Sequence, residues 1–299
     1  MPAPTPYRGR LAPTPTGYLH LGHARTFHTA WKRARQAQGK LIVRIEDLDP
    51  RRCRAEFAEA AVADLRWLGL DWDASPELGG PHAPYIQSQR RAIYAAAWEQ
   101  LRAGGWIYPC WRSRKDLREA PTAPHEHDAT AEALYLSKWR PEPGLEKEFE
   151  APGIARVPEE GIPNWRFRVP AGTPVRFEDG RCGAQTLTAG EDFGDFVIWN
   201  REDVPAYELA VVVDDAAMAI SEVVRGEDLL KSTARQLLVY EALGLEPPLW
   251  WHTPLLRDGD GQRLAKRHAS LSLRELRARG EDPQKLLEAS DAELQALMS

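Results

Sequence analysis

Cysteine is scarce in this sequence: Cys53, Cys110 and Cys182 are the three in a chain of 299 residues. They lie far apart, and none belongs to a Cys-x-x-Cys pair. The sequence therefore predicts neither a disulfide framework nor a cysteine-rich zinc site, and it indicates a reducing compartment.

Long apolar runs are also missing. No stretch of about 18 apolar residues occurs, which excludes a membrane-spanning helix, and the first ten residues lack the apolar segment of a signal peptide. The hydrophobic content of 43% is enough for a buried core, and the length fits one large or two ordinary domains. We expect a folded protein of the cytoplasm.

Positive charge is not in excess, since the formal net charge is -5. Proteins that bind polyanions through a general basic field carry the opposite balance, so any contact with nucleic acid must be local. Three basic clusters are present: Lys32-Arg33-Arg35, Arg51-Arg52-Arg54 and Arg112-Arg114-Lys115-Arg118. Each cluster alone is typical of a solvated helix face.

What is present begins with alternating strand and helix patterns. The apolar periodicity predicts strands at 9–11 and 41–45 and helices at 21–38 and 56–68, which is the order of a βαβ unit. A further helix is predicted at 88–103, where a pair of glycines follows.

The composition changes between residues 106 and 205, which are rich in Pro, Gly and charge. Short strands are predicted there at 165–169 and 196–199, so we interpret this segment as an inserted α+β module. A continuous apolar run at 208–213, ending in two aspartates, is typical of a strand buried on both faces. It predicts that the parallel sheet resumes there.

The remaining elements are a strand at 219–224, a helix at 228–243, a strand at 250–256, a polar loop at 257–268 and short terminal helices. The predicted fold class is α/β, a doubly wound parallel sheet split by the insertion, with a short helical C-terminal segment. The predicted parts are 1–105 and 206–256 for the two halves of the sheet domain, 106–205 for the insertion, and 257–299 for the loop and terminal helices.

The sharpest local signal is the run Pro13-Thr-Pro-Thr-Gly-Tyr-Leu-His20-Leu-Gly22-His23, which ends a predicted strand and opens a predicted helix. His20 and His23 lie on one face of the first helical turn, where backbone N–H groups and the positive dipole end attract phosphate. Gly22 lets a bulky ligand approach the backbone closely. By itself the run is equally compatible with ordinary capping or surface histidines.

A second signal is the run Arg263-Leu-Ala-Lys266-Arg267, in a loop that also contains Gly259 and Gly261. A cationic loop can close over a triphosphate, although alone such a run is more typical of a basic surface loop. The two runs gain meaning only together.

Together they resemble the HIGH and KMSKS motifs of class I aminoacyl-tRNA synthetases, in the order and at the separation which that family shows. Four further runs resemble its glutamyl branch: Arg10-Leu-Ala-Pro-Thr-Pro-Thr-Gly, Val43-Arg-Ile-Glu46-Asp-Leu-Asp-Pro50, Ala206-Tyr207-Glu-Leu-Ala-Val-Val-Val-Asp214-Asp215 and Val224-Arg225-Gly-Glu-Asp. The resemblance implies a Rossmann-like catalytic domain that activates glutamate with ATP as an adenylate.

The resemblance places glutamate recognition on Arg10, Leu11, Ala12, Pro13, Thr14, Glu46, Tyr207 and Arg225. Chemically, Glu46 can pair with the ammonium group, and Arg10 and Arg225 can bind the carboxylates. Tyr207 can add a hydroxyl donor. Without the family, structural ion pairs and a buried Tyr would explain most of these residues.

For ATP, the resemblance implies binding by His20, Gly22, His23 and Lys266, with His20, His23 and Lys266 as the catalytic groups. Fixed cations and donors would stabilise the negative charge that spreads as glutamate attacks the α-phosphorus. Mg²⁺ is expected with the triphosphate, and the sequence identifies no ligand for it.

Family members often carry a zinc site in the insertion, with a Cys-x-Cys pair followed by a Tyr and a Cys. Here Cys110 matches the first position and Tyr135 the third, while Arg112 and Trp139 replace the two other cysteines. An Arg cannot ligate a cation, so we expect no zinc at these positions.

Two further details bear on the resemblance. His125 and His127 could in principle rebuild a metal site, although a His-Glu-His run in a polar loop is more typical of solvated side chains. Ala265 stands where the KMSKS motif usually has Ser, which removes a hydroxyl but keeps the cation at Lys266.

The sequence ends about thirty residues after the KMSKS-like run, where synthetases that charge the tRNA 3′ end continue into anticodon-binding helices. We therefore expect no anticodon-binding domain, as in a shortened branch whose members activate glutamate without tRNA and attach it to the queuosine base of tRNA(Asp). A monomer is expected. Two alternatives stay open: a shortened synthetase that charges the 3′ end, and a non-catalytic RNA-binding relative.

Overall fold

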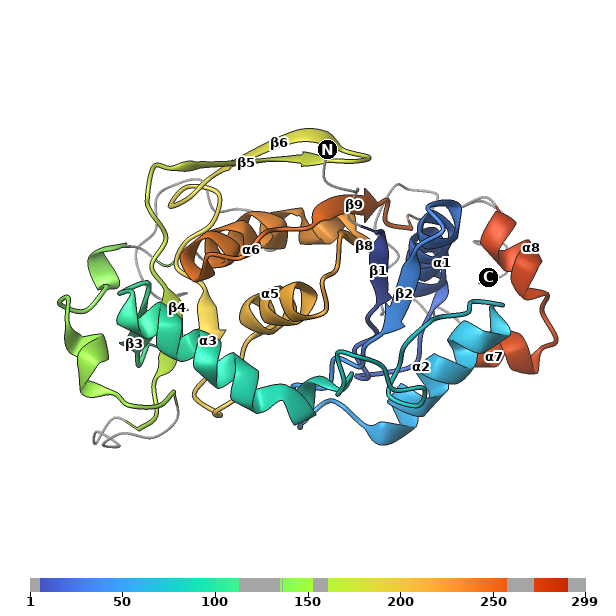
Figure 1. The fold of residues 1–299 in the computed structure, drawn as a ribbon, viewed down its shortest axis with the longest axis horizontal. Helices are drawn as coiled ribbons and strands as arrows, with labels where there is room; N and C mark the ends of the chain where they lie inside the picture. Colours follow the sequence, from blue (N-terminus) through green and yellow to red (C-terminus); the bar gives the residue numbers. More distant parts are fainter. Residues whose placement is uncertain (1–5, 113–134, 136, 153–160, 257–271, 290–299) are drawn as a thin grey trace.

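The computed structural model describes residues 6–112, 135, 137–152, 161–256 and 272–289. Figure 1 shows an elongated arrangement of these residues, with the first strands and helices at one end and the strands of the insertion at the other. The helix α3 (Arg91–Ala103) runs along one edge toward the insertion. The KMSKS-like run, His125 and His127 lie outside the described residues.

The βαβ unit predicted at the start is confirmed. β1 (Arg8–Leu11) pairs in parallel with β2 (Lys40–Val43), α1 (Leu21–Gln36) connects them, and α2 (Ala55–Trp67) follows. Because apolar residues recur every three or four positions, α1 turns one stripe toward the core. The buried residues of this stripe are Leu21, Ala24, Phe27, Ala30 and Ala34.

The strand predicted at 208–213 is wrong. This run lies in the helix α5 (Tyr207–Ala217), whose residues 208–215 are all buried. A short apolar run does not distinguish a strand buried on both faces from a helix that is buried all round. The structure places α5 between α3 and α6 (Leu230–Leu243), so this helix is covered on several sides.

The two aspartates that end this run therefore lie inside a helix. Asp215 accepts a hydrogen bond from Arg44 at 2.7 Å, and Asp214 accepts one from Arg90 at 2.6 Å. Buried carboxylates are tolerated when cations and donors pair with them. The core of the protein thus contains a network of charges.

The parallel sheet resumes one element later than predicted. β8 (Glu222–Gly226) pairs in parallel with β9 (Leu249–Thr253), and α6 connects them. The N–H of Ser221 donates to the Arg8 carbonyl at 2.9 Å, which holds the start of β8 beside β1. The parallel α/β architecture is confirmed, as are the strands and the helix predicted after residue 218, within a few residues at each end.

The insertion contains an antiparallel sheet and a hairpin. β3 (Ile107–Cys110), β4 (Asn164–Phe167) and β7 (Val197–Trp199) form the antiparallel sheet, which confirms the two strands predicted there. β5 (Pro174–Asp179) and β6 (Gly183–Thr188) form a hairpin that was not predicted. β5 also pairs in parallel with β9, and Figure 1 shows the hairpin alongside that strand. The insertion therefore extends the sheet of β8 and β9, and the predicted boundaries of the parts stay predictions.

Short helices complete the described structure: η1 (Gln87–Arg90), η2 (Ser137–Trp139), η3 (Leu145–Glu148), η4 (Glu227–Leu229), α7 (Leu273–Ala278) and α8 (Pro283–Glu288). None of the described helices combines the length and the apolar character needed to cross a bilayer.

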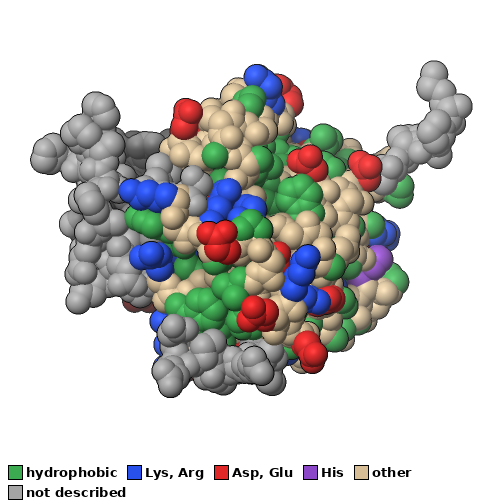
Figure 2. Space-filling model, turned by 90° about the vertical axis from the view of Figure 1, so that its left-hand side faces the viewer, with side chains coloured by type: hydrophobic (Ala, Val, Ile, Leu, Met, Phe, Trp, Pro, Cys, Tyr) green, Lys and Arg blue, Asp and Glu red, His purple; other side chains and the backbone are tan. Residues whose placement is uncertain are grey.

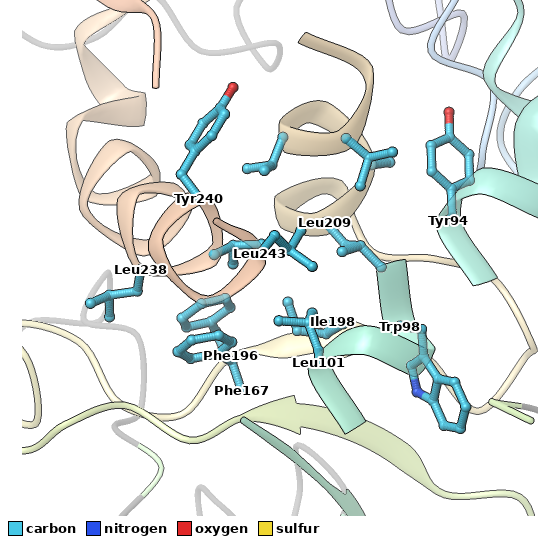
Figure 3. Packing of buried hydrophobic residues seen from close by; sticks show 14 of the residues in the cluster. Tyr94, Trp98, Leu101, Phe167, Phe196, Ile198, Leu209, Leu238, Tyr240 and Leu243 are labelled. Atoms are coloured by element: carbon cyan, nitrogen blue, oxygen red, sulfur yellow. The ribbon is translucent and has the colours of Figure 1, made fainter. Parts of the chain in front are cut away.

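The larger of the two main hydrophobic clusters joins the insertion to the helices of the sheet domain. Figure 3 shows Leu101 of α3, Leu209 of α5 and Leu243 of α6 near the centre of this cluster, with Trp98 of α3 to one side and Phe167 of β4 below Leu243. These side chains are nearly or fully buried. Their packing holds α5 in place, and with it Tyr207, the first residue of this helix, which lies in the candidate active site.

The described residues on the face shown in Figure 2 form no continuous basic patch, which agrees with the expectation of local contacts with nucleic acid. On the face shown in Figure 2, Lys and Arg side chains are interspersed with Asp and Glu and with apolar side chains. Two members of a predicted basic cluster are already paired, Arg51 with Glu202 at 2.7 Å and Arg52 with Asp49 at 2.6 Å. Exposed pairs of this kind contribute little to stability.

Candidate active site

A cavity of about 630 Å³ opens where β1, the start of α1, the start of α5 and β8 meet. Predicted site residues from all four elements line it: Arg10, Ala12, Thr14, His20, Gly22, His23, Glu46, Tyr207 and Arg225. The fold therefore brings together side chains that are up to about two hundred positions apart in the sequence. Lys266 lies outside the described residues, so its assigned role stays a prediction.

Leu11 and Pro13 are buried beside the cavity and are not part of its lining. The Leu11 carbonyl accepts the N–H of Arg44 at 2.9 Å, and the Pro13 carbonyl accepts the N–H of Glu46 at 3.0 Å. Backbone pairing thus continues beyond β1 and β2 and places Glu46 at the cavity. A direct contact of Leu11 or Pro13 with glutamate stays a prediction.

His20 and His23 form the N-terminal cap of α1. The Nδ1 atom of His20 accepts the N–H of Gly22 at 3.2 Å, and the His20 N–H donates to Nδ1 of His23 at 3.2 Å. The ring centroids are 3.8 Å apart. Because each Nδ1 accepts, a neutral ring carries its proton on Nε2. Two such N–H donors at a helix N-terminus suit the oxygens of a phosphate.

Gly22 has a second reason for lacking a side chain. A Cβ at this position would lie 3.1 Å from Cε1 and 3.3 Å from Nδ1 of His20. The ring of His20 would then have to move, and its capping bond would weaken. Gly22 therefore preserves the arrangement of the histidines, besides allowing the predicted close approach of a ligand.

Two predicted glutamate contacts belong to the buried charge network. Arg44 donates to Oε1 of Glu46 at 2.9 Å and to Asp215 at 2.7 Å. The Nε atom of Arg10 lies 3.7 Å from Asp215 and has no hydrogen-bond partner within the described part of the chain. Burial raises the pKa of Glu46, while Arg44 and Arg10 act in the opposite direction. The Glu46 carboxylate thus already interacts with Arg44 and Arg10. The ammonium group of an amino acid bound in the cavity would be a further cation beside it.

Arg225 is buried and lines the cavity beside Tyr207. Its Nη1 atom donates to Gln236 at 2.9 Å and to the Tyr207 hydroxyl at 3.3 Å, and its Nη2 atom donates to Thr233 at 2.7 Å. Burial raises the pKa of Tyr207, so its phenol is neutral at physiological pH. All these partners of Arg225 are neutral. Its positive charge is therefore available to a carboxylate in the cavity.

Sequence reasoning missed several residues of the lining. These are Leu21, Thr26, Phe27, Val224, Gly226, Asp228, Leu229, Pro254, Leu255 and Leu256. Asp228 belongs to a run that resembles the glutamyl branch, and that position was the available signal for it. Residues 254–256 follow β9. They lie at the cavity because β9 pairs with β8, and no local sequence pattern displays that pairing.

Within the described ranges, no three His, Cys, Asp or Glu side chains are grouped as a metal would require. Two carboxylates, Glu46 and Asp228, do line the cavity. Mg²⁺ is commonly held by one or two carboxylates together with substrate phosphates and water, which is compatible with this lining.

The positions that correspond to the family's zinc site come together in the insertion. The Cys110 Sγ lies 3.3 Å from the Tyr135 hydroxyl, which donates to the Trp139 carbonyl at 3.0 Å. The Arg112 guanidinium lies 5.8 Å from the centre of the Trp139 ring. Burial raises the pKa of Tyr135, so its oxygen keeps its proton and is a poor metal ligand. The cluster offers a thiol, a phenol, an indole and a guanidinium where zinc would need four donors.

We therefore predict that the purified chain binds zinc far below one equivalent after incubation with excess zinc and desalting. Elemental analysis measures this directly, and Cys110→Ser provides the control because it removes the single thiol of the cluster. One zinc per chain in the original protein, lost in Cys110→Ser, would show that other groups complete the site.

Comparison with known proteins gives a consistent result over nearly the whole chain. Residues 7–290 match the family described as tRNA synthetases class I (E and Q), catalytic domain. The chain is 48% identical to the glutamyl-Q tRNA(Asp) synthetase of Nitratidesulfovibrio vulgaris, over 91% of this chain and 82% of that protein. It is 47% identical to the protein of the same name from Symbiobacterium thermophilum, over 92% and 83% of the two chains.

Longer relatives match with lower identity. Glutamate–tRNA ligase 1 of Halorhodospira halophila is 42% identical, over 93% of this chain but 56% of its own length. A crystal structure of a glutamate tRNA ligase from Elizabethkingia meningosepticum, in complex with its amino acid, superposes with a TM-score of 0.73 at 30% identity. The similarity covers 92% of this chain and 53% of that one. This chain thus spans about half the length of these ligases.

Proposed function

The chain belongs to the class I tRNA synthetases of the glutamate and glutamine group, and it is therefore a ligase; from this premise we propose that it activates L-glutamate with ATP in the absence of tRNA and transfers the glutamyl group to the queuosine base of tRNA(Asp) as a monomer. The observation that carries the proposal is the cavity, which is lined both by the cationic side chains of Arg10 and Arg225 and by a helix N-terminus capped by His20 and His23. It combines sites for carboxylates and for phosphate.

Recognition of glutamate follows from the charges. Arg10 and Arg225 offer guanidinium donors to the two carboxylates, and Tyr207 adds a hydroxyl. Glu46 offers its carboxylate to the ammonium group. Glutamine would place an amide where a carboxylate is expected, so one of the charge-assisted bonds would be lost.

The reaction has two steps. An oxygen of the glutamate α-carboxylate bonds to the α-phosphorus of ATP, and the bond from that phosphorus to the bridging oxygen breaks, which releases pyrophosphate. His20 and His23 donate hydrogen bonds to the phosphate oxygens as negative charge moves to the leaving group. Mg²⁺, when bound with ATP, neutralises further oxygens. A hydroxyl of the acceptor then attacks the activated carbonyl carbon, loses its proton, and displaces AMP.

The identity of the acceptor is supported by the relatives. Two proteins named glutamyl-Q tRNA(Asp) synthetase are 47% and 48% identical to this chain, whereas the glutamate–tRNA ligase 1 compared above is 42% identical. The former are also matched over 82–83% of their length. These similarities favour the queuosine base over the tRNA 3′ end.

We predict that the purified chain exchanges labelled pyrophosphate into ATP with glutamate and Mg²⁺ and without any tRNA. Glutamine should support the exchange about five- to a hundredfold less well, because an unmatched polar group costs about 1–3 kcal/mol and each 1.4 kcal/mol is a factor of ten. Steady-state exchange with each amino acid measures this. Equal rates with glutamine, or a strict requirement for tRNA, would count against the proposed activation step.

We also predict that labelled glutamate is attached only to tRNA that contains queuosine. The comparison uses tRNA from cells with and without queuosine, each with an intact 3′ end and with its 3′-terminal nucleotide removed. Periodate is not used to block the 3′ end, because it also oxidises the cis-diol of queuosine. Labelling that persists without queuosine but is lost with the terminal nucleotide would identify the chain as a synthetase of the ordinary 3′-charging type.

A further inference from the structure

Arg225 is held in a way that differs from the other buried arginines of the site. Arg44 contacts two carboxylates at 2.7 and 2.9 Å, and Arg10 lies 3.7 Å from Asp215. The contacts of Arg225 within the described residues are instead with neutral groups: its Nε atom is 3.3 Å from Nε2 of His252. A carboxylate in direct contact would neutralise Arg225 and compete with a substrate carboxylate.

The sheet explains why His252 lies beside Arg225. In the parallel pairing of β8 and β9, Arg225 and His252 are register partners, so their side chains emerge on the same face. His252 is fully buried, and Thr233 of α6 contacts the same Nε2 atom at 3.1 Å. Burial and these contacts therefore hold the imidazole of His252 in one orientation.

The other side of the imidazole faces the inserted hairpin. Asp179, the last residue of β5, lies with Oδ2 at 2.6 Å from Nδ1 of His252 and accepts the backbone N–H of the same residue at 3.1 Å. The backbone N–H groups of Arg181 and Cys182 also donate to Asp179, at 3.1 and 2.7 Å. Asp179 is itself 99% buried. The hairpin thus places a carboxylate, held by several hydrogen bonds, against the Nδ1 side of the His252 ring.

The protonation states define the direction of each hydrogen bond. Burial, together with the charge of Arg225, lowers the pKa of His252 to about 4, so its ring is neutral at physiological pH. Burial alone would raise the pKa of Asp179, but the N–H of Cys182 and the ring of His252 lower it, so this carboxylate is ionised. An ionised carboxylate can only accept, and the single ring proton of His252 therefore lies on Nδ1.

With its proton on Nδ1, the imidazole presents the lone pair of Nε2 to Arg225. The Nε–H of Arg225 then donates to His252, while Gln236 and Thr233 accept from the two terminal nitrogens. The guanidinium plane is fixed at three points, and within the described residues none of its hydrogen-bond partners is a carboxylate.

We propose that Asp179 is a positioning residue which, through the imidazole of His252, orients the Arg225 guanidinium for the carboxylate of the substrate. The inference rests on the proposed function, because the carboxylate is taken to be that of glutamate. It assigns the inserted hairpin a part in amino-acid binding: the β5 strand supplies the group that determines which nitrogen of His252 faces Arg225.

The test compares Asp179→Asn with Glu178→Gln in the full chain. Both changes replace a carboxylate on β5 by an amide, but the side chain of residue 178 is exposed and points away from His252. An Asn can donate from its NH₂ group to Nδ1 of His252, and the ring proton would then lie on Nε2. The Nε2–H of His252 and the Nε–H of Arg225 would face each other as two donors with no acceptor between them. Nitrogen NMR of protein labelled in its histidine rings reports the tautomer, with His252→Gln identifying the signal. Calorimetry measures the Kd of glutamate, and pyrophosphate exchange measures the KM of each substrate.

We expect Asp179→Asn to move the ring proton of His252 to Nε2 and to raise the Kd and KM of glutamate about tenfold, the effect of one charge-assisted hydrogen bond. The KM of ATP should stay within about twofold, and Glu178→Gln should match the original protein throughout. A general structural defect would instead change both KM values and leave the tautomer in place.

Several outcomes would overturn the inference. If the Asp179→Asn variant folds and binds glutamate with unchanged affinity, the inference is wrong, whether or not the tautomer of His252 changes. If that variant does not fold, His252→Gln and His252→Leu decide, because the Gln oxygen can still accept from Arg225 and Leu cannot; equal affinities in these two contradict the proposal. Failure of the original protein to bind glutamate overturns the proposed function and this inference with it, whereas glutamate binding that is unaffected by the variants overturns the inference alone.

Discussion

Arg225→Gln should lower kcat/KM for glutamate in pyrophosphate exchange by about a hundred- to a thousandfold. Removing one partner of a buried, hydrogen-bonded charge pair costs about 2–5 kcal/mol, and each 1.4 kcal/mol corresponds to a factor of ten. Most of the loss should be a raised KM for glutamate, because the guanidinium binds the carboxylate in the ground state as well as in the transition state. The KM of ATP should change little.

The structure predicts this large effect because no nearby group can replace the cation. Arg10 is held by Asp215 and the Val224 carbonyl, which its Nη1 atom reaches at 2.9 Å, and Arg44 is occupied by two carboxylates. A Gln side chain at residue 225 could still bond to His252 or Thr233, so the fold should tolerate the change. The loss therefore reports on the charge and not on packing.

Arg33→Gln is the matched control. Arg33 also binds to β8, through two bonds to Glu222 at 2.6 and 2.7 Å, but it does not line the cavity. Its replacement should lower the melting temperature and leave the KM of glutamate within about threefold, since the change removes a structural ion pair. Equal losses of glutamate activation in the two variants would mean that Arg225 acts through the stability of β8 and not through the ligand.

The parts of the fold that could be predicted are those with a strong local pattern. The apolar residues of α1, from Leu21 to Ala34, recur at helical spacing, and the histidine-containing run precedes them at the N-terminal cap. Both the helix and its first residue therefore follow from the sequence. The run at 208–213 gave the opposite result. Its residues are buried in every direction, and because the apolar signal then has no period, strand and helix are equally compatible with it.

The candidate site was predictable where a residue's own segment carried a signal. His20, Gly22 and His23 stand together at the start of a helix, and the structure places all of them at the cavity. Asp179 and His252 carried no such signal, because their contact depends on the pairing of β5 with β9 across 73 positions. Such a contact is a property of strand order, which a single sequence does not display.

The double change His20→Ala with His23→Ala should lower kcat for adenylate formation by about a hundredfold or more, the usual loss for donors that act in a transition state. Glutamate affinity should be nearly unchanged, because neither ring takes part in the carboxylate contacts. Lys266→Ala should have a similar effect if the KMSKS-like run closes on the triphosphate as the resemblance implies.

The histidines have a second role that must be separated from catalysis. They cap α1, and the loss of a helix cap costs about 0.5–2 kcal/mol of stability. His20→Asn with His23→Gln keeps hydrogen-bond acceptors at both positions, so we expect it to recover most of the melting temperature of the original protein without recovering kcat. His28→Ala serves as the control on the same helix, since His28 stacks on Trp31, 5.9 Å away, and does not line the cavity. If instead the Asn and Gln variant regained both stability and kcat, the imidazole rings would not be required at the phosphate end of the cavity, because the amide N–H donors would have replaced their Nε2–H donors.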